Sequence, residues 1–240
     1  MAVTFEHIGN DQTLSKIIEE KIEEAIRNKK YLPDEKLPTE KELCEMFGVS
    51  RTALREALQM LSSRGLIYIK KGSGIYVENY SPTNVTKPMQ LYLELNFDKN
   101  YLKYIVQVRK ILEPQIAGIA AKNRTDEEIQ LIRKNLEELK NCPRSDYKRE
   151  GQLDRDFHLI LARATQNPMI PLIIGPIYEI MPKIKLMVYK IVTKAKEAAL
   201  DYHALIAEAV VQRDEERAVQ LMKEHLEIAE EHAMIVAEQM

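Results

Sequence analysis

The sequence predicts a mainly α-helical protein made of an N-terminal winged helix-turn-helix and a C-terminal all-α helical bundle. Three observations support this prediction. Capping residues and glycines divide residues 11–77 into three helices and a short hairpin. A polar stretch with two prolines follows. Beyond it, apolar residues recur at helical spacing. We therefore expect a winged helix-turn-helix domain at 1–78, a linker at 79–88 and a helical domain at 89–240.

The composition is that of an ordinary globular protein, with 45% hydrophobic and 30% charged residues and a net charge of −2. No apolar run is long enough for a membrane span, and the first residues lack the apolar core of a signal peptide. The two cysteines, Cys44 and Cys142, show no motif spacing and are expected to be free thiols. We expect a cytoplasmic protein without a membrane partner.

The first two helices are predicted from periodicity and capping. Residues 11–28 place isoleucines and leucines at helical spacing, which indicates an amphipathic helix. Two prolines in KKYLPDEKLP interrupt it. Thr39 and Glu42 then form a capping-box pattern that starts a short helix, EKELCEMF, which Gly48 ends.

The third helix and the hairpin complete the winged helix-turn-helix. Ser50 can cap the helix RTALREALQMLSSRG, which stops at Gly65. Its leucines Leu54, Leu58 and Leu61 lie on one face and would hold it to the domain core. The segment LIYIKKGSGIYV reads as two short strands around a tip of lysines and glycines.

The start of the third helix carries side chains suited to DNA. Ser50, Arg51, Thr52 and Arg55 lie in its first turn and a half, where a recognition helix enters the major groove. Residues 51–77 hold five basic residues and one acidic residue, a local surplus on a nearly neutral chain. The wing tip can reach the minor groove or the backbone. A solvated charged face would have a similar composition.

The C-terminal half is expected to be helical throughout. The expected elements are helices at 100–123, at 128–140 after a capping box of Thr125 and Glu128, at 145–165, at roughly 196–212 and at 214–239. Between them lies a strongly apolar segment with three prolines, Pro171, Pro176 and Pro182, which should kink its helix.

Four polar residues in this half form a candidate metal site. Asp154 and His158 stand four residues apart, so both leave the same helix face one turn apart. His203 and His225 lie in the last two helices, flanked by apolar residues that would direct them inward. Three histidines and an aspartate suit zinc, nickel, manganese or iron. Spacing alone also fits a surface hydrogen bond between Asp154 and His158, with the other two histidines serving as core or surface residues.

Two stretches of the chain resemble a known family. KLPTEKELCEMFGVSRTALREALQMLSSRGLIYIKKGSGIYV resembles the DNA-binding domain of the GntR family of bacterial regulators. VRKILEPQIAGIAA, LDRDFHLILARATQNP and the two late histidines resemble the helical effector domain, the FCD domain, of its FadR-type subfamily. The resemblance covers most of the chain. It implies a DNA-binding transcriptional regulator, not an enzyme, controlled by a small molecule.

The resemblance assigns roles to residues of the recognition helix. In the family the two arginines of an S-R-T-x-x-R-E pattern contact the operator, which implies this role for Arg51 and Arg55. Ser50 and Thr52 match positions that approach bases or phosphates.

Two further positions match family contacts to the DNA backbone. Lys41 stands where the family usually has an arginine. The positive charge is kept, but the planar guanidinium that can form two parallel hydrogen bonds to a phosphate is lost. Gly72 corresponds to the glycine of the wing. The segment PDEKLP departs from the Pro-Gly turn that the family often has, which affects the shape of this loop.

The resemblance also implies a ligand set and an effector class. In the metal-binding branch of the subfamily the ligands match Asp154, His158, His203 and His225, with zinc as the first choice of ion. The effectors there are small carboxylates that complete the coordination of the metal. Arg109 matches an arginine that can pair with such a carboxylate, although a surface arginine would fit the pattern nearly as well.

The resulting hypothesis is a homodimer, acting as a repressor, that binds a two-fold symmetric operator and releases it when an organic acid joins the metal. Three alternatives stay open. The metal site could be catalytic, although no nearby residue has a clear acid or base role. The pocket could hold an acyl chain or sugar acid without metal. The metal itself could be the signal.

Overall fold

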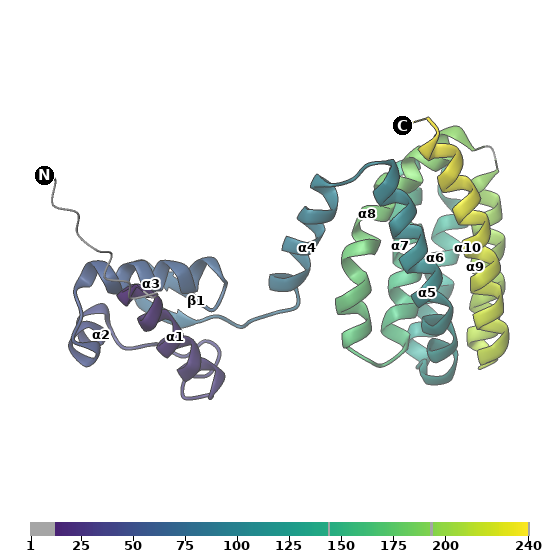
Figure 1. Ribbon diagram of the computed structural model, residues 1–240. Coiled ribbons are helices and arrows are strands. Elements are labelled where there is room, and N and C mark those ends of the chain that lie inside the picture. The colour runs from purple at the N-terminus through teal and green to yellow at the C-terminus, as the bar shows by residue number, and fades with distance from the viewer. Residues whose placement is uncertain (1–12, 144, 193, 240) are drawn as a thin grey trace, which may run out of the picture. The chain divides into compact units, whose positions relative to one another are not determined.

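The computed structural model describes residues 13–143, 145–192 and 194–239 (Figure 1). Within these ranges the chain forms ten helices and two strands, which confirms the predicted mainly α class. It divides into two compact units after Asn84, a position inside the stretch predicted as the linker.

The first unit has the order of a winged helix-turn-helix. Its elements are α1 (Leu14–Arg27), α2 (Glu40–Phe47), α3 (Arg51–Ser63), β1 (Ile67–Lys70) and β2 (Gly74–Val77). The two strands pair antiparallel, with Ile67 opposite Val77 and Lys70 opposite Gly74. Each element agrees with its predicted place because its boundaries are encoded locally.

The boundaries of α2 and α3 show this local encoding. Thr39 Oγ1 accepts a hydrogen bond from the Glu42 amide at 3.3 Å, and Glu42 Oε2 accepts from the Thr39 amide at 2.7 Å, which completes the capping box. Gly48 ends α2 with φ of +66°, a conformation that disfavours a side chain. Ser50 caps α3 by accepting from the Ala53 amide.

The core of this unit consists of the apolar faces of α1 and α3 together with the hairpin. Leu54, Leu58 and Leu61 are all buried, as their spacing predicts. An ionic contact joins the same two helices at their edge: Arg64, which follows α3, lies 2.6 Å from both Glu19 and Glu23 of α1. The third helix is therefore fixed on two sides, and its N-terminal turn faces solvent.

The second unit is an all-α bundle, as predicted. Its helices are α4 (Thr83–Leu95), α5 (Lys99–Asn123), α6 (Asp126–Asn141), α7 (Tyr147–Ala164), α8 (Met169–Ile191), α9 (Ala195–Val211) and α10 (Glu215–Ala237). Helix α5 packs along α10, and α7 packs along α8 (Figure 1). The capping box of Thr125 and Glu128 is present at the start of α6.

Helix α4 lies partly where the sequence pattern predicts a linker, and α8 contains prolines. Helix α4 begins at Thr83, inside the expected linker, and continues through Pro88. Its apolar residues Leu91, Tyr92 and Leu95 are exposed, which explains why no buried-face periodicity marks it. Helix α8 contains Pro176 and Pro182 within one helical span.

A close approach between α7 and α8 positions the centre of the bundle. A side-chain carbon added at Gly151 would lie 3.0 Å from the Pro182 Cα and 3.1 Å from the Pro182 carbonyl oxygen. The absence of a side chain at Gly151 therefore lets the two helices come together one turn before Asp154.

Two predictions about the chain as a whole can be compared with the structure. Cys44 and Cys142 are free thiols. Among the described residues, no helix combines the length and the apolar character that crossing a membrane requires. The N-terminal residues examined for a signal peptide lie outside the described ranges.

Candidate functional site

The four predicted metal ligands all lie in the core of the second unit. Asp154 and His158 come from α7, His203 from α9 and His225 from α10, and all four are buried. One ring nitrogen of each histidine lies within 4.8 Å of those of the other two. The alternative of a surface hydrogen bond between Asp154 and His158 is therefore wrong, because neither side chain reaches the surface.

One carboxylate oxygen of Asp154 has polar partners, and the other has none among the described residues. Its Oδ1 lies 2.8 Å from Lys185 Nζ and accepts a hydrogen bond from the Tyr189 hydroxyl at 3.4 Å. The other oxygen, Oδ2, has no hydrogen-bond partner among the described residues. Burial raises the pKa of Asp154, but Lys185 and the nearby histidines outweigh it, so the pKa is held below its usual value and the carboxylate is ionised.

His203 and His225 also present unpartnered nitrogens. Both ring nitrogens of His203 and Nε2 of His225 have no hydrogen-bond partner in the described part of the chain. Burial lowers the pKa of each well below 6.5, so both rings are neutral at pH 7. A neutral imidazole with a free lone pair is the form that binds a metal. Phe157 stacks on His203 at 4.0 Å and fixes its ring plane.

His158 is held by a residue that the sequence analysis missed. Its Nδ1 lies 2.8 Å from Glu113 Oε2, on α5. A carboxylate at one ring nitrogen of a histidine orients the ring and makes the other nitrogen a better ligand. Burial raises the pKa of Glu113, but Arg109 and His158 outweigh it and hold the pKa at about 2.

Arg109 lies inside the cluster and not on the surface. Its side chain is 2% exposed and donates two hydrogen bonds to Glu113, at 2.5 and 3.3 Å. Its Nη2 lies 3.4 Å from His158 Nε2. The alternative of a surface arginine is thus wrong, and the guanidinium stands beside the predicted ligands.

Sequence reasoning also missed Lys185 and Tyr189, which lie one turn apart on α8. The available signal was a lysine within a strongly apolar helix, PKIKLMVYK, a pattern that more often marks a side chain reaching out to solvent. Lys185 is instead buried, and its ammonium pairs with Asp154.

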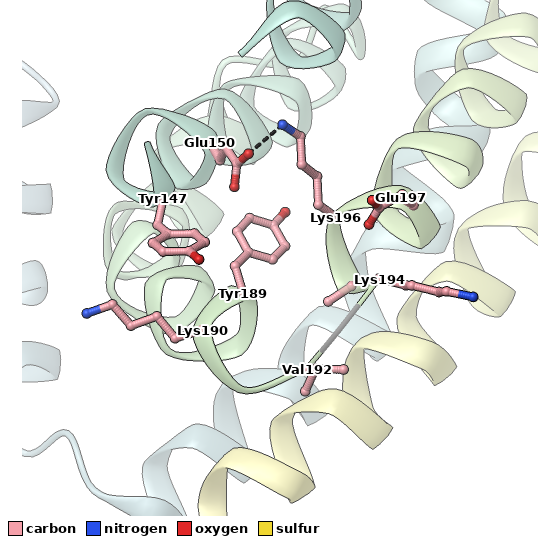
Figure 2. A pocket seen from close by; sticks show the side chains of 9 residues that line it. Tyr147, Glu150, Tyr189, Lys190, Val192, Lys194, Lys196 and Glu197 are labelled. Carbon is pink, nitrogen blue, oxygen red and sulfur yellow. Dashed lines mark ion pairs between the residues drawn. The ribbon is translucent and has the colours of Figure 1, made fainter. Parts of the chain in front are cut away.

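A surface pocket of about 510 Å³ lies next to this cluster, at the start of α7, the end of α8 and the start of α9 (Figure 2). Tyr189 is part of its lining and also contacts Asp154 in the interior. The buried Glu150, one turn before Asp154 on α7, forms an ion pair with Lys196 across the pocket (Figure 2). Tyr189 therefore borders both the pocket and the predicted ligand Asp154.

The predicted DNA contacts lie on the N-terminal unit and are largely exposed. Arg51 and Thr52 are exposed in the first turn of α3. The Arg55 side chain is 64% exposed, and its Nε donates a hydrogen bond to Glu40. The hydroxyl of Ser50 caps the helix, so its side chain has a structural role.

The two remaining predicted contacts flank the recognition helix along the chain. The Lys41 side chain is 77% exposed, with Glu45 at 3.9 Å as a weak surface partner. Gly72 forms the hairpin tip with φ of +76°, which explains the glycine in structural terms.

Comparison with known proteins agrees with both units. Residues 104–228 match the FCD domain, and residues 14–77 match bacterial regulatory proteins of the gntR family. The chain belongs to the GntR family. Its combination of a GntR helix-turn-helix with an FCD domain is that of the FadR-type regulators.

Relatives of this GntR regulator are transcriptional regulators as well. It is 31% identical over 217 residues to the HTH-type transcriptional regulator YcbG of Bacillus subtilis, covering 90% of this chain and 88% of the relative. It is 28% identical to the HTH-type transcriptional repressor NanR of Citrobacter rodentium, covering 89% and 82%. The fold resembles that of Streptococcus agalactiae GntR, with a TM-score of 0.66, 24% identity and coverage of 90% and 99%.

These comparisons decide the general function. The GntR regulator is a DNA-binding transcriptional regulator and not an enzyme, which removes the metalloenzyme alternative.

Proposed function

We propose that this GntR regulator is a homodimeric repressor whose FCD domain holds a divalent metal, to which a small organic carboxylate binds as the effector. The observation that carries the proposal is a set of buried atoms without partners among the described residues: His203 Nδ1 and Nε2 and His225 Nε2 in the histidine cluster, and Oδ2 of the adjacent Asp154. Asp154 Oδ1 lies 3.8 Å from His203 Nε2. Buried polar atoms in folded proteins are nearly always paired, so a group of unpaired ones marks a place for a ligand.

The donor set fits a transition metal. Three imidazoles and one carboxylate are suited to zinc, nickel, manganese or iron, with zinc as the first choice. His158 is already oriented by Glu113, as ligating histidines usually are. A bound ion would supply a fixed positive centre with coordination positions left for a carboxylate. Arg109, with its guanidinium 3.4 Å from His158, would stand beside that carboxylate.

The DNA side of the proposal rests on the exposed start of α3. Arg51 and Arg55 project from the turn that a recognition helix inserts in the major groove. A two-fold symmetric operator would present one half-site to each protomer.

An exposed apolar stripe supports a second copy as the partner in the dimer. Tyr104, Ile111 and Ile119 recur at seven- and eight-residue spacing on α5, and Ile111 is 71% exposed. Two such stripes can cover each other about a two-fold axis. Replacing Ile111 with glutamate should then produce monomers in sedimentation equilibrium.

Release of the operator by the effector requires that the effector site is coupled to the DNA-binding unit. Arg109 and Glu113 lie on the same helix, which follows α4 and the wing along the chain. A ligand that displaces Arg109 would therefore act on the helix that directly follows α4 in sequence. The ligand can do so only if it binds the DNA-free and DNA-bound states with different affinity.

The first experiment is elemental analysis of the purified, extensively dialysed protein. About one transition metal per chain is the expected result. The second arm measures operator binding by anisotropy during titration with small carboxylates, with and without the metal. No metal after reloading with zinc, nickel and manganese would contradict the proposal. Release of the operator by metal alone would show that the ion is the signal, and release by an acid without metal would show a metal-free pocket.

A further inference from the structure

The interior of the FCD domain holds two cations and two anions in direct contact. Lys185 Nζ lies 2.8 Å from Asp154 Oδ1, and Arg109 is hydrogen-bonded to both oxygens of Glu113. All four side chains are almost fully buried. His158 contacts both members of the first pair, Glu113 with one ring nitrogen and Arg109 with the other. The second pair is reached through His203, whose ring centroid lies 5.1 Å from that of His158 and whose Nε2 lies 3.8 Å from Asp154 Oδ1. The four charges therefore belong to one cluster.

The formal charges of this cluster cancel. Arg109 and Lys185 are positive, and Glu113 and Asp154 are negative. A histidine that binds a metal does so as the neutral imidazole and adds no charge. The neighbouring ion pair of Glu150 and Lys196 also cancels.

A divalent ion added to a neutral, buried cluster leaves two positive charges without partners. Uncompensated charge in a protein interior is strongly unfavourable. In a related site without Lys185, Asp154 would instead offset one charge of the metal, and a single negative charge would complete the balance. The buried lysine thus changes which ligand can complete the site.

We propose that the effector of this regulator is a dianion and that Lys185 sets this requirement. The inference rests on the metal site proposed above. The shared chemistry is two negative charges on oxygen close to the metal. A dicarboxylate brings both charges with it. A 2-hydroxy monocarboxylate brings one charge and would supply the second by releasing its hydroxyl proton to solvent on binding.

The position of Lys185 allows it to meet such a ligand. Its ammonium has three N–H donors, and Asp154 Oδ1 can accept only one of them. A cavity of about 20 Å³, enough for about one water molecule, is lined by Lys185 and Arg109 together. A ligand oxygen that enters this cavity faces both cations.

The same cavity is too small for a whole organic acid. Residues of α5, α8 and α10 line it as well, among them Val106, Ile184 and His232, so a larger ligand must move these three helices apart. The dianion would therefore be both the charge that completes the site and the cause of a change in helix packing.

The test compares ligands that differ by one charge. Calorimetry on the metal-loaded full-length protein uses pairs of similar length, malonate with propionate and succinate with butyrate, and adds 2-hydroxybutyrate. We expect at least one dicarboxylate to bind about tenfold or more tightly than its monocarboxylate partner, or 2-hydroxybutyrate to do so with release of one proton. Titration in buffers of different ionisation enthalpy measures that proton. Equal affinity within each pair and no proton release, including no binding at all, would overturn the inference.

Lys185→Met supplies the second arm. Removing one positive charge should lower the preference for the dianion by about tenfold, while the metal content stays at the wild-type level. Lys183→Met is the matched control, because Lys183 is exposed on the same helix and its loss should leave the preference unchanged. Lys185→Arg keeps the charge and should restore the preference. An unchanged preference in Lys185→Met would show that Lys185 only stabilises the fold.

These results separate the two proposals. Absence of bound metal in the wild-type protein would contradict the proposed function itself. Bound metal without a preference for dianions would leave that function intact and contradict only the role of Lys185. If Lys185→Met does not fold, the ligand pairs on the wild-type protein still decide the question.

Discussion

Arg55 Nε donates a hydrogen bond to Glu40 Oε2, 2.9 Å away, and so links the recognition helix α3 to the first residue of α2. The contact uses the Nε side of the guanidinium. Both Nη groups keep donors for a guanine edge or a phosphate. The guanidinium of Arg55 is therefore already oriented before DNA binds, which reduces the side-chain conformational entropy lost on binding.

Replacing Arg51 or Arg55 with alanine should weaken operator binding by about 1–3 kcal/mol. Each change removes a side chain that projects from the first turns of α3. Fluorescence anisotropy with a labelled operator measures the effect. Arg27→Ala is the control, since Arg27 is an exposed arginine of α1 paired with Glu23. Unchanged binding by both α3 variants would show that this helix does not read the DNA.

Replacing Glu40 with glutamine should reduce discrimination between operator and unrelated DNA. The exposed pair with Arg55 is worth about 1 kcal/mol or less, so the ratio of the two affinities should fall by at most about fivefold. Binding to unrelated DNA should rise slightly because a negative charge is lost. Glu45→Gln, on the same helix, should raise unspecific binding without altering the ratio. An unaltered ratio in Glu40→Gln would mean that the contact does not orient Arg55.

The elements of the DNA-binding unit could be predicted because their signals are local. The capping box of Thr39 and Glu42 and the turn at Gly48 are each encoded within a few residues, and the structure has both. The pair of Arg55 and Glu40 joins residues fifteen positions apart, and no periodicity indicates it. It depends on the angle between two helices, which only the fold shows.

The candidate metal site shows the same division. The one-turn spacing of Asp154 and His158 follows from helix geometry, His203 and His225 are candidates because of their apolar neighbours, and the resemblance to the GntR family matches all four positions. Glu113 and Lys185 could not be found in this way, because a charged residue in a helix is usually exposed. Their burial depends on partners contributed by other helices.

The stability of the DNA-binding unit should fall at acid pH through Glu19. The hydrogen bond from Lys16 outweighs burial and, together with Arg64, lowers the pKa of Glu19 below 4.5. Because the folded pKa is below the unfolded one, this stabilisation is complete above about pH 4.5 and is lost as the pH falls through the folded pKa. Urea unfolding of Glu19→Gln between pH 7 and pH 3 should show a weaker pH dependence than the wild-type protein. The exposed Glu24→Gln is the control and should retain the wild-type slope.

Replacing His203 with alanine should abolish the response to the effector and leave operator binding by the metal-free protein intact. The change removes one of the three clustered histidines that we propose as ligands in the FCD domain, and it alters nothing in the winged helix-turn-helix. Metal content and operator affinity are measured on the same preparation. Glu208→Ala, a change at an exposed residue of the same helix, is the control. Loss of folding in His203→Ala, seen by circular dichroism, would show that the metal is structural.

Replacing Gly151 with alanine should destabilise the FCD domain by about 1–3 kcal/mol. The new methyl group would lie 3.0 Å from the Pro182 Cα. Because this is a backbone atom, it cannot move aside by a change of rotamer, and α8 itself must move away from α7. The movement would also draw Lys185 away from Asp154, because both residues lie within one turn of the contact. Thermal unfolding should therefore occur at a lower temperature, and binding of a dianion should weaken together with it.

The matched control for this change lies in the same helix pair. Gly175→Ala adds the same methyl group on α8, where nothing lies within 4 Å. Removing a helical glycine without a clash should raise stability by up to about 1 kcal/mol. The two substitutions should thus have effects of opposite sign. If Gly151→Ala were as well tolerated as Gly175→Ala, the close approach of α7 and α8 would not be what holds Lys185 beside Asp154.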